Sequence, residues 1–256
     1  MSLLEARGIS KSFAGIKALD DVSIDVDLGE RVGVIGPNGA GKTTLFNCML
    51  GVIDADAGTV VFGGEDLAGL QVHQRATLGI GRTFQRIELF GEMTVREHLL
   101  VAERVRGGLG SIWKDLIGQG RPRPEEIERC DEVLDLLGLG DLAEEPIEAL
   151  SLGKGRLVEV GRALMTDPRL LLLDEPSSGL DRDETTSLAA TLRTVQEERG
   201  FAILLVEHDV ELVADFTERA SVLDFGQVIA TGSTSAVMAD PIVREAYLGD
   251  LDEVTS

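Results

Sequence analysis

A glycine-rich stretch with one lysine is the first feature of this sequence that could do chemistry. It reads Gly-Pro-Asn-Gly-Ala-Gly-Lys-Thr over residues 36–43 and matches the phosphate-binding pattern G-x-x-x-x-G-K-[ST] at every fixed position. Glycines let backbone N–H groups turn inward around an anion, and Lys42 can neutralise the β- and γ-phosphates of a nucleotide. The Thr43 hydroxyl is a suitable Mg²⁺ ligand. The candidate phosphate-binding residues are Gly36, Asn38, Gly39, Ala40, Gly41, Lys42, Thr43 and Thr44.

Two acids, Asp174 and Glu175, follow the apolar run at residues 170–173. In open α/β sheets, ligands bind at the carboxyl ends of the strands, and this run would deliver both carboxylates to such an end. Asp174 would hold the magnesium ion through water, and Glu175 is placed to activate an attacking water. Many strands end in surface acids, so the pair is informative only together with residues 36–43. In combination the two motifs indicate hydrolysis of a nucleoside triphosphate.

Hydrophobic patterning predicts the elements that must position these residues. A short apolar run at residues 31–35 precedes the glycine stretch, and apolar residues recur at helical spacing over residues 42–51. The runs at 169–173 and 202–206 are apolar without alternation, as in strands buried on both faces of a parallel sheet. A crossover helix is expected over residues 183–200. These segments predict an α/β core with a parallel sheet.

Two further parts of the chain have patterns of their own. Residues 3–10 and 18–26 alternate apolar and polar positions, as half-buried strands do. Residues 92–165 have several helical patterns and no strand-like run, and Thr94 with Glu97 is typical of a helix N-terminal capping box. We therefore expect residues 92–165 to form a helical insertion in the α/β core.

The composition limits the classes of protein to which the chain can belong. Lys and Arg total 24 against 45 Asp and Glu, a formal net charge of −21 over 256 residues. Repulsion from phosphate backbones argues against nucleic acid as a partner. The two cysteines, Cys48 and Cys130, are too few for a disulfide framework or a metal cluster. No segment has the roughly 20 apolar residues of a membrane-spanning helix. We expect a cytoplasmic chain that reaches a membrane only through a partner.

With both motifs placed, the sequence resembles the ATP-binding subunit of an ABC transporter along essentially its whole length. Residues 150–154 resemble the family signature, usually Leu-Ser-Gly-Gly-Gln, and residues 178–181 resemble the D-loop that crosses the dimer interface. Gln85 resembles the Q-loop glutamine, which senses Mg²⁺ and the γ-phosphate and faces the membrane subunit. His208 matches the switch histidine near the γ-phosphate, and Phe13 lies where the family has an aromatic residue that stacks on adenine. Counted without Phe13, the six motifs occur in the family's order.

The resemblance implies a fold and a set of site residues. The fold is a single ABC ATPase domain over residues 1–256, an α/β P-loop NTPase (RecA-like) core with an antiparallel β subdomain and an inserted α-helical subdomain. The core and its β subdomain would comprise residues 1–91 and 166–256, and residues 92–165 would carry the signature. The implied ligands are ATP and Mg²⁺. The implied catalytic residues are Glu175, His208 and Gln85, and the implied metal ligands are Thr43, Gln85 and Asp174.

The signature departs from the usual pattern at two positions. Leu152 stands where glycine is usual, and Lys154 stands where glutamine or glutamate is common. The Ser151 hydroxyl and the Gly153 N–H can still hold the γ-phosphate of an ATP bound to a second cassette, because the N-terminus of a helix attracts anions. Asp181 of the D-loop completes the nucleotide-contacting residues that the resemblance implies. Lys154 is either a further cation of this site or a solvated lysine. In the first case, we expect Lys154→Gln to alter turnover and to leave ATP affinity unchanged.

The partners also follow from the resemblance. Two ATP molecules would lie between two cassettes arranged head to tail, so the chain needs a second ABC ATPase, a copy of itself or a sibling. The other implied partners are integral membrane permease subunits, which would hold the chain on the inner face of the cell membrane, and, indirectly, a periplasmic or extracellular solute-binding protein.

Three stretches resemble one group within the family, the ATP-binding subunits of branched-chain (hydrophobic) amino-acid importers. They are Gly-Ile-Gly-Arg-Thr-Phe-Gln at residues 79–85, the long interval before the signature with its loop at 107–124, and the ending at residues 240–249. Lipopolysaccharide exporters share a similar ending, and urea importers share much of the rest of the sequence. A non-transport alternative is a soluble ATPase of iron–sulfur assembly, and a further alternative is a catalytically degenerate, binding-only subunit that depends on a partner cassette. The presence of Glu175 and His208 argues against the last of these.

Overall fold

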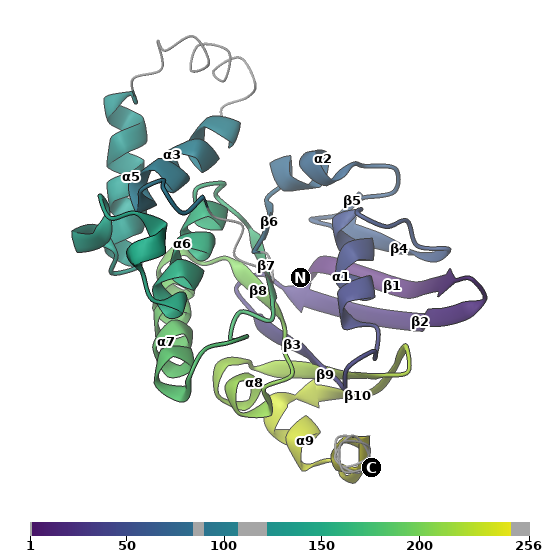
Figure 1. Ribbon diagram of the computed structural model, residues 1–256. Coiled ribbons are helices and arrows are strands. Elements are labelled where there is room, and N and C mark those ends of the chain that lie inside the picture. Colours follow the sequence, from purple (N-terminus) through teal and green to yellow (C-terminus); the bar gives the residue numbers. More distant parts are fainter. Residues whose placement is uncertain (1, 84–89, 107–121, 247–256) are drawn as a thin grey trace.

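The chain forms two β-sheets and a separate group of helices, shown in Figure 1. This computed structural model describes residues 2–83, 90–106 and 122–246, and the statements below refer to those residues. The α/β fold class expected from the sequence is confirmed. The described helices include none that is long and apolar enough to cross a membrane.

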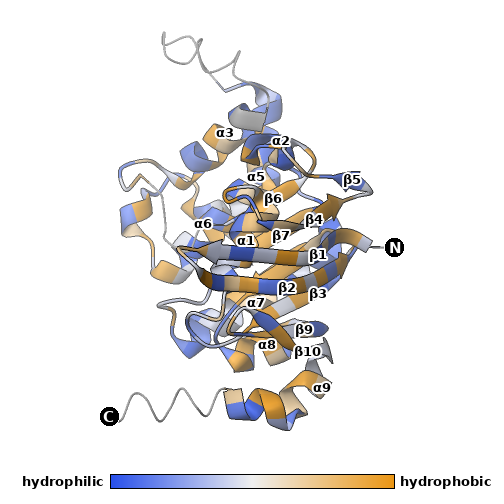
Figure 2. Cartoon of the chain, turned by 90° about the vertical axis from the view of Figure 1, so that its right-hand side faces the viewer, coloured by the Kyte–Doolittle hydropathy of each residue, from blue (hydrophilic) through white to orange (hydrophobic). Residues whose placement is uncertain are grey.

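The smaller sheet is antiparallel and has the strand order β2-β1-β4-β5. The two segments with alternating polarity form strands, as predicted, and these pair as the hairpin of β1 and β2. Figure 2 shows hydrophobic and hydrophilic residues along both strands. Each strand buries one face, which is why the period is two. The strands are β1 (Ser2–Phe13), β2 (Ile16–Asp27), β4 (Ala57–Phe62) and β5 (Glu65–Asp66).

The larger sheet has the strand order β10-β9-β3-β8-β7-β6 and is parallel from β9 to β6. Only the edge strand β10 runs antiparallel to its neighbour. The strand that precedes the glycine stretch therefore lies beside β8, and β8 lies beside β7. The strands are β3 (Arg31–Ile35), β6 (Ile80–Arg82), β7 (Leu170–Asp174), β8 (Ala202–Val206), β9 (Arg219–Asp224) and β10 (Gln227–Ser233).

The helices include those expected from the sequence. The crossover helix is α7, and the Thr94 capping box is formed at the start of α3, where the Thr94 N–H donates to Glu97 Oε2 (2.9 Å) and the Glu97 N–H donates to Thr94 Oγ1 (3.2 Å). The α-helices are α1 (Lys42–Leu50), α2 (Val72–Thr77), α3 (Val95–Arg106), α5 (Pro124–Leu136), α6 (Leu152–Leu164), α7 (Arg182–Arg199), α8 (Val210–Phe216) and α9 (Thr234–Ala239). Two 3₁₀ turns, Gly140–Leu142 and Ile147–Ala149, lie between α5 and α6.

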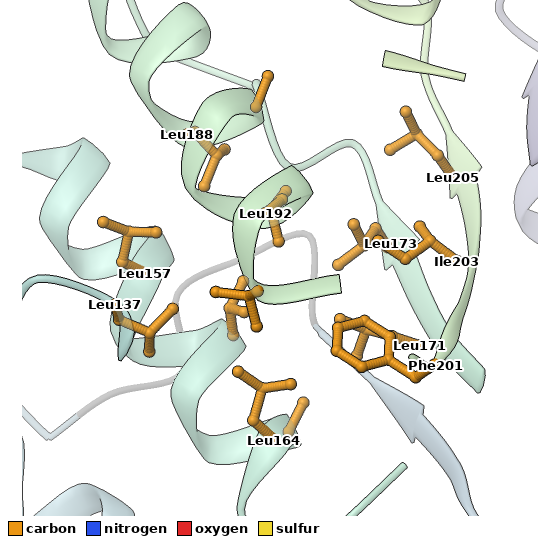
Figure 3. Packing of buried hydrophobic residues seen from close by; sticks show 14 of the residues in the cluster. Leu137, Leu157, Leu164, Leu171, Leu173, Leu188, Leu192, Phe201, Ile203 and Leu205 are labelled. Atoms are coloured by element: carbon orange, nitrogen blue, oxygen red, sulfur yellow. The ribbon is translucent and has the colours of Figure 1, made fainter. Parts of the chain in front are cut away.

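The central strands β7 and β8 have apolar side chains on both faces of the larger sheet. Leu171 and Leu173 belong to a cluster with residues of α6 and α7, as Figure 3 shows. Leu170 and Leu172 belong to a second cluster, which is shared with α1 and the antiparallel sheet. Because both faces are covered, these strands have uninterrupted apolar sequences.

Candidate nucleotide site

Glycines shape the loop between β3 and α1, through positive φ angles and through close backbone contacts. Gly39 and Gly41 have φ angles of +81° and +106°, in the region that side chains disfavour. A Cβ on Gly41 would lie 2.5 Å from the carbonyl oxygen of Ala18, and one on Gly36 would lie 2.0 Å from that of Leu223. The backbone of the loop is thus enclosed by β2 and β9, and its path is fixed.

Lys42 begins α1 and lies against this loop. Its side chain is only 5% exposed, and Nζ donates to the carbonyl oxygens of Gly36 (2.6 Å) and Pro37 (3.0 Å). The first turn of α1 contains no acidic residue, so the positive end of the helix is not neutralised from within. Thr43 is exposed at this end and Thr44 is half-buried. The loop, the ammonium group and the helix terminus together form a cradle for a polyphosphate.

Asp174 ends β7 and is 2% exposed. Burial raises the pKa of its carboxyl group, against the attraction of Arg82, whose Nη2 lies 3.4 Å from Oδ2. The other oxygen, Oδ1, has no hydrogen-bond partner among the described residues. A buried carboxylate oxygen without a hydrogen-bond partner is a suitable ligand for a hard divalent cation. The residues present therefore fit a magnesium ion.

Glu175 has a left-handed backbone conformation, with φ at +47°. Such a conformation costs a non-glycine residue about 1–2 kcal/mol and persists only where the surroundings enforce it. Here the Glu175 N–H donates to the carbonyl oxygen of Val206 (2.9 Å), the last residue of β8. This bond ties the segment that carries Glu175 to the segment that carries His208. The His208 side chain is half exposed and therefore accessible to a ligand.

Glu207 is a buried acid in the site to which the sequence interpretation gave no role. Its side chain is fully buried, and its carboxylate accepts backbone N–H groups from Ser177 (2.9 Å) and His208 (3.1 Å). An acid placed directly after the five apolar residues of β8 is a signal that could have identified it, because such a residue must either reach water or find internal donors.

The signature stretch begins α6. Ser151 is the N-cap, and its Oγ accepts the Lys154 N–H at 3.3 Å. The α6 helix packs on α3, α5 and α7. A Cβ on Gly179 would lie 3.0 Å from Leu152 Cδ2, and one on Gly153 would lie 3.3 Å from Glu184 Oε1. Within one chain the signature therefore lies beside residues 178–181 and the start of α7.

Two other predicted residues have local contacts of their own. Asp181 is the N-cap of α7, and its Oδ1 accepts the Glu184 N–H at 2.8 Å. Phe13 is 45% exposed and pairs with Ile16, two residues from Ala18, whose carbonyl oxygen lies near Gly41. Its ring is thus accessible on the side of the hairpin near the phosphate loop. Gln85 lies outside the described residues.

The structure brings one group of predicted residues together at the carboxyl ends of adjacent strands. The phosphate loop follows β3, His208 follows β8, Asp174 ends β7 and Glu175 follows it. Ser151 and Gly153 form a second group at the start of α6. The first group can hold a nucleotide and activate a water molecule, and the second offers an anion site on another surface element.

Two family models match the sequence. The model described as "ABC transporter" matches residues 19–178, and the one described as "Branched-chain amino acid ATP-binding cassette transporter" matches residues 227–253. The first match includes the phosphate loop, Asp174 and Glu175, and the second covers a segment nearer the C-terminus.

Curated relatives match over almost their full length. The high-affinity branched-chain amino acid transport ATP-binding protein BraF of Pseudomonas aeruginosa is 36% identical, with 97% of this chain and 98% of the relative covered. Its counterpart LivG of Escherichia coli is 37% identical, with the same coverage. The lipopolysaccharide export system ATP-binding protein LptB of Haemophilus influenzae is also 37% identical, with 98% of each chain covered.

Solved structures agree with the fold. A nucleotide-free ATP-binding cassette from an ABC transporter superposes with a TM-score of 0.86 at 34% identity, covering 96% of this chain and 99% of that one. The ADP conformation of MJ1267, an ATP-binding cassette of an ABC transporter, gives the same TM-score at 35% identity, covering 97% and 99%.

Proposed function

The chain belongs to the ABC transporter family, and from that premise we propose that it binds and hydrolyses Mg²⁺·ATP to power a membrane importer for branched-chain or other hydrophobic amino acids. One observation carries the proposal. The phosphate loop, Asp174, Glu175 and His208 meet at the carboxyl ends of the adjacent strands β3, β7 and β8.

The phosphate loop and α1 would bind the triphosphate. Backbone N–H groups of residues 36–41 and the positive end of α1 face the phosphates, and Lys42 exchanges its loop carbonyl partners for β- and γ-phosphate oxygens. Phe13 stacks on the adenine. Thr43 and Asp174, with Gln85, would hold the magnesium ion, which when bound neutralises charge on the phosphate oxygens.

Glu175 and His208 would carry the chemical step. Glu175 accepts a proton from the water that attacks the γ-phosphorus, while the bond from that phosphorus to the bridging oxygen breaks and ADP leaves. His208 contacts the γ-phosphate from the neighbouring strand. The hydrogen bond from the Glu175 N–H to the Val206 carbonyl oxygen holds the segment of Glu175 beside the segment of His208. Both side chains are therefore positioned before the substrate binds.

A second cassette would complete each site. Ser151 and Gly153 stand at the start of α6, away from the phosphate loop, and would hold the γ-phosphate of an ATP bound to the partner. Two chains arranged head to tail would then enclose two nucleotides. Hydrolysis would release the chains from each other, and the membrane subunits would follow that motion.

A groove of about 320 Å³ between α2, α3 and β6 is suited to the permease. Exposed Val52, Val72 and Val101 line it and give it an apolar part, beside charged residues of α2, β6 and α6. Arg82 also lines it and pairs with Asp174, which connects the groove to the metal-binding end of the site. We assign this groove to a cytoplasmic segment of a permease subunit, and the chain to the inner face of the cell membrane.

The amino-acid substrate is supported by the family model that matches residues 227–253. Percentage identity does not decide it, because the lipopolysaccharide export protein LptB is as similar as the amino-acid transport proteins BraF and LivG. Lipopolysaccharide export is therefore the second candidate function. Amino-acid import would also involve an external solute-binding protein.

Purification of the chain from detergent-solubilised native membranes tests this proposal. We expect two multi-spanning subunits to co-purify, and their type separates an importer from an exporter. The purified complex should hydrolyse ATP only with Mg²⁺, and Glu175→Gln should lower kcat about 100-fold or more, as expected for a lost general base. Recovery with soluble partners alone, or equal rates for wild type and variant, would contradict the proposal.

A further inference from the structure

Glu207 is a fully buried carboxylate directly before His208. Its own N–H donates to the carbonyl oxygen of Val34 at 3.2 Å, so its backbone is attached to β3 just before the phosphate loop. An ionised group without water needs internal donors, and the positions of those donors show what it holds.

The two carboxylate oxygens bind two different loops. Oε1 accepts the Ser177 N–H at 2.9 Å, in the loop that follows Glu175. Oε2 accepts the His208 N–H at 3.1 Å and the Asp209 N–H at 3.5 Å, in the loop that follows β8. Charge-assisted bonds of this kind are stronger than those between neutral groups. The carboxylate thus joins the loop of the general base to the loop of the histidine.

Arg156 attaches the α6 helix to the same place. It lies one turn beyond Ser151, is largely buried, and its Nη2 donates to the Ser178 carbonyl oxygen at 3.1 Å. Burial lowers the pKa of Arg156, and the negative charges of Glu159 and Glu207 act in the opposite direction. Arg156 and Glu207 thus bind consecutive residues of one loop, the Ser178 carbonyl oxygen and the Ser177 N–H.

We propose that Glu207 is a positioning residue for ATP hydrolysis, which fixes His208 relative to the loop of Glu175, and that Arg156 couples this pair of loops to the signature helix. The inference rests on the proposed function. Because α6 carries the signature, any shift of α6 on contact with a second cassette is transmitted through Arg156, Ser178 and Glu207 to His208.

The Glu207→Gln variant tests the positioning role. The amide keeps one acceptor oxygen but presents N–H groups to the other loop, so one of the two attachments is lost while the volume is preserved. We expect kcat for Mg²⁺·ATP hydrolysis to fall about 10- to 100-fold, the effect of a slightly misplaced catalytic group, with KM and nucleotide Kd within about twofold. Hydrogen–deuterium exchange should rise in peptides that cover residues 176–181 and 207–210.

Glu126→Gln is the matched control. Glu126 is also a buried carboxylate that accepts a backbone N–H, from Arg123 at 2.8 Å, but it caps α5. We expect it to leave kcat and the exchange of both site peptides at wild-type values. If Glu207→Gln retained the wild-type kcat, or left exchange in both peptides unchanged, the positioning role would be wrong.

The Arg156→Met variant tests the coupling and leaves the carboxylate in place. We expect a lower kcat with unchanged nucleotide Kd, and an effect that is not additive with Glu207→Gln because both act on residues 176–181. Additive effects would overturn the coupling. A wild-type chain without Mg²⁺-dependent hydrolysis would contradict the proposed function instead, and the exchange measurements would still decide whether Glu207 joins the loops.

Discussion

At the residue scale, the protonation state of Asp174 that suits the fold differs from the one that its proposed function requires. Its carboxylate is buried at the end of β7, and burial raises its pKa, which means that the folded chain favours the protonated form. The ionised form is nevertheless the one that would bind magnesium. The residue is thus retained at a cost to the fold, which is typical of a functional position.

The Asp174→Asn variant should therefore be more stable than wild type at neutral pH. Asparagine resembles the protonated carboxyl group, so we expect Tm to rise by about 2–4 °C, the shift for on the order of 1 kcal/mol in a chain of this size. An acid whose pKa is raised by folding costs stability increasingly from its unfolded pKa upward, and in full above its native pKa. The gain should therefore shrink as the pH falls below the native pKa of Asp174, and vanish below the pKa of an unfolded aspartate, about 3.9.

Thermal unfolding of both proteins between pH 3.5 and 8 measures this difference, and ATP hydrolysis should be lost in the variant. A Tm below that of wild type at pH 7 would show instead that the ion pair with Arg82 outweighs the cost of burial.

At the scale of elements, one buried arginine holds α1 to the segment around α2. Arg75 donates from Nη1 to the carbonyl oxygens of Cys48 (3.1 Å) and Met49 (2.8 Å), at the end of α1. It also donates to those of Leu67 (2.9 Å) and Leu70 (3.0 Å). The helix that begins at the phosphate loop is thus fixed at its far end by a single side chain.

The Arg75→Met variant should lose about 3–5 kcal/mol of unfolding free energy, because four buried or part-buried carbonyl groups lose the Arg75 donor and, among the described residues, only those of Cys48 and Leu67 also accept a loop N–H, from Gly51 (3.2 Å) and Leu70 (3.1 Å). Urea denaturation followed by circular dichroism measures the loss. Arg193→Met is the control, since Arg193 contacts Asp215 at the surface and should change stability by less than about 1 kcal/mol. Equal losses in the two variants would contradict the role of Arg75.

The elements also show what could be predicted from the sequence and why. The long strands and helices, such as β1, β2, α5 and α7, can be recognised because their apolar residues recur at the spacing of a strand or a helix. The strand β6 has only three residues and depends on its pairing with β7, and the β9–β10 hairpin depends on β3, so local patterning alone did not predict them.

The site residues divide in the same way. Lys42, Asp174 and His208 were predicted as site residues, because short motifs and their order indicate them. Glu207 was not, because its role depends on the N–H of Ser177, 30 residues away in sequence and adjacent only in the fold. The proximity of Leu152 to Gly179 is also visible only in three dimensions: a Cβ on Gly179 would lie 3.0 Å from Leu152 Cδ2.

At the scale of the whole molecule, the charge of −21 opposes the association of two chains. The proposed dimer must overcome this repulsion with the binding energy of two nucleotides held between the chains. The acidic surface therefore makes dimerisation sensitive to ionic strength.

A hydrolysis-deficient chain should display this dependence. We expect Glu175→Gln with Mg²⁺·ATP to form dimers in analytical ultracentrifugation, and the dimer fraction to increase from about 10 mM to 150 mM salt, as the screening length falls from about 30 Å to 8 Å. Adding Lys42→Ala should restore the monomer, because the phosphate-binding cation is lost. A dimer fraction that does not change when the nucleotide is omitted or Lys42 is replaced would contradict the head-to-tail arrangement.

The two-sided burial of β7 and β8 has a consequence for how this sequence can diverge. Adjacent residues on one strand, such as Leu171 and Leu172, belong to different clusters. A substitution at Leu171 can be compensated only from the side of α6 and α7, and one at Leu172 only from the side of α1. Among homologues, successive positions of these strands should therefore covary with two separate sets of partners, one for each face of the sheet. Side-chain sizes in one cluster can then change while those in the other cluster stay the same.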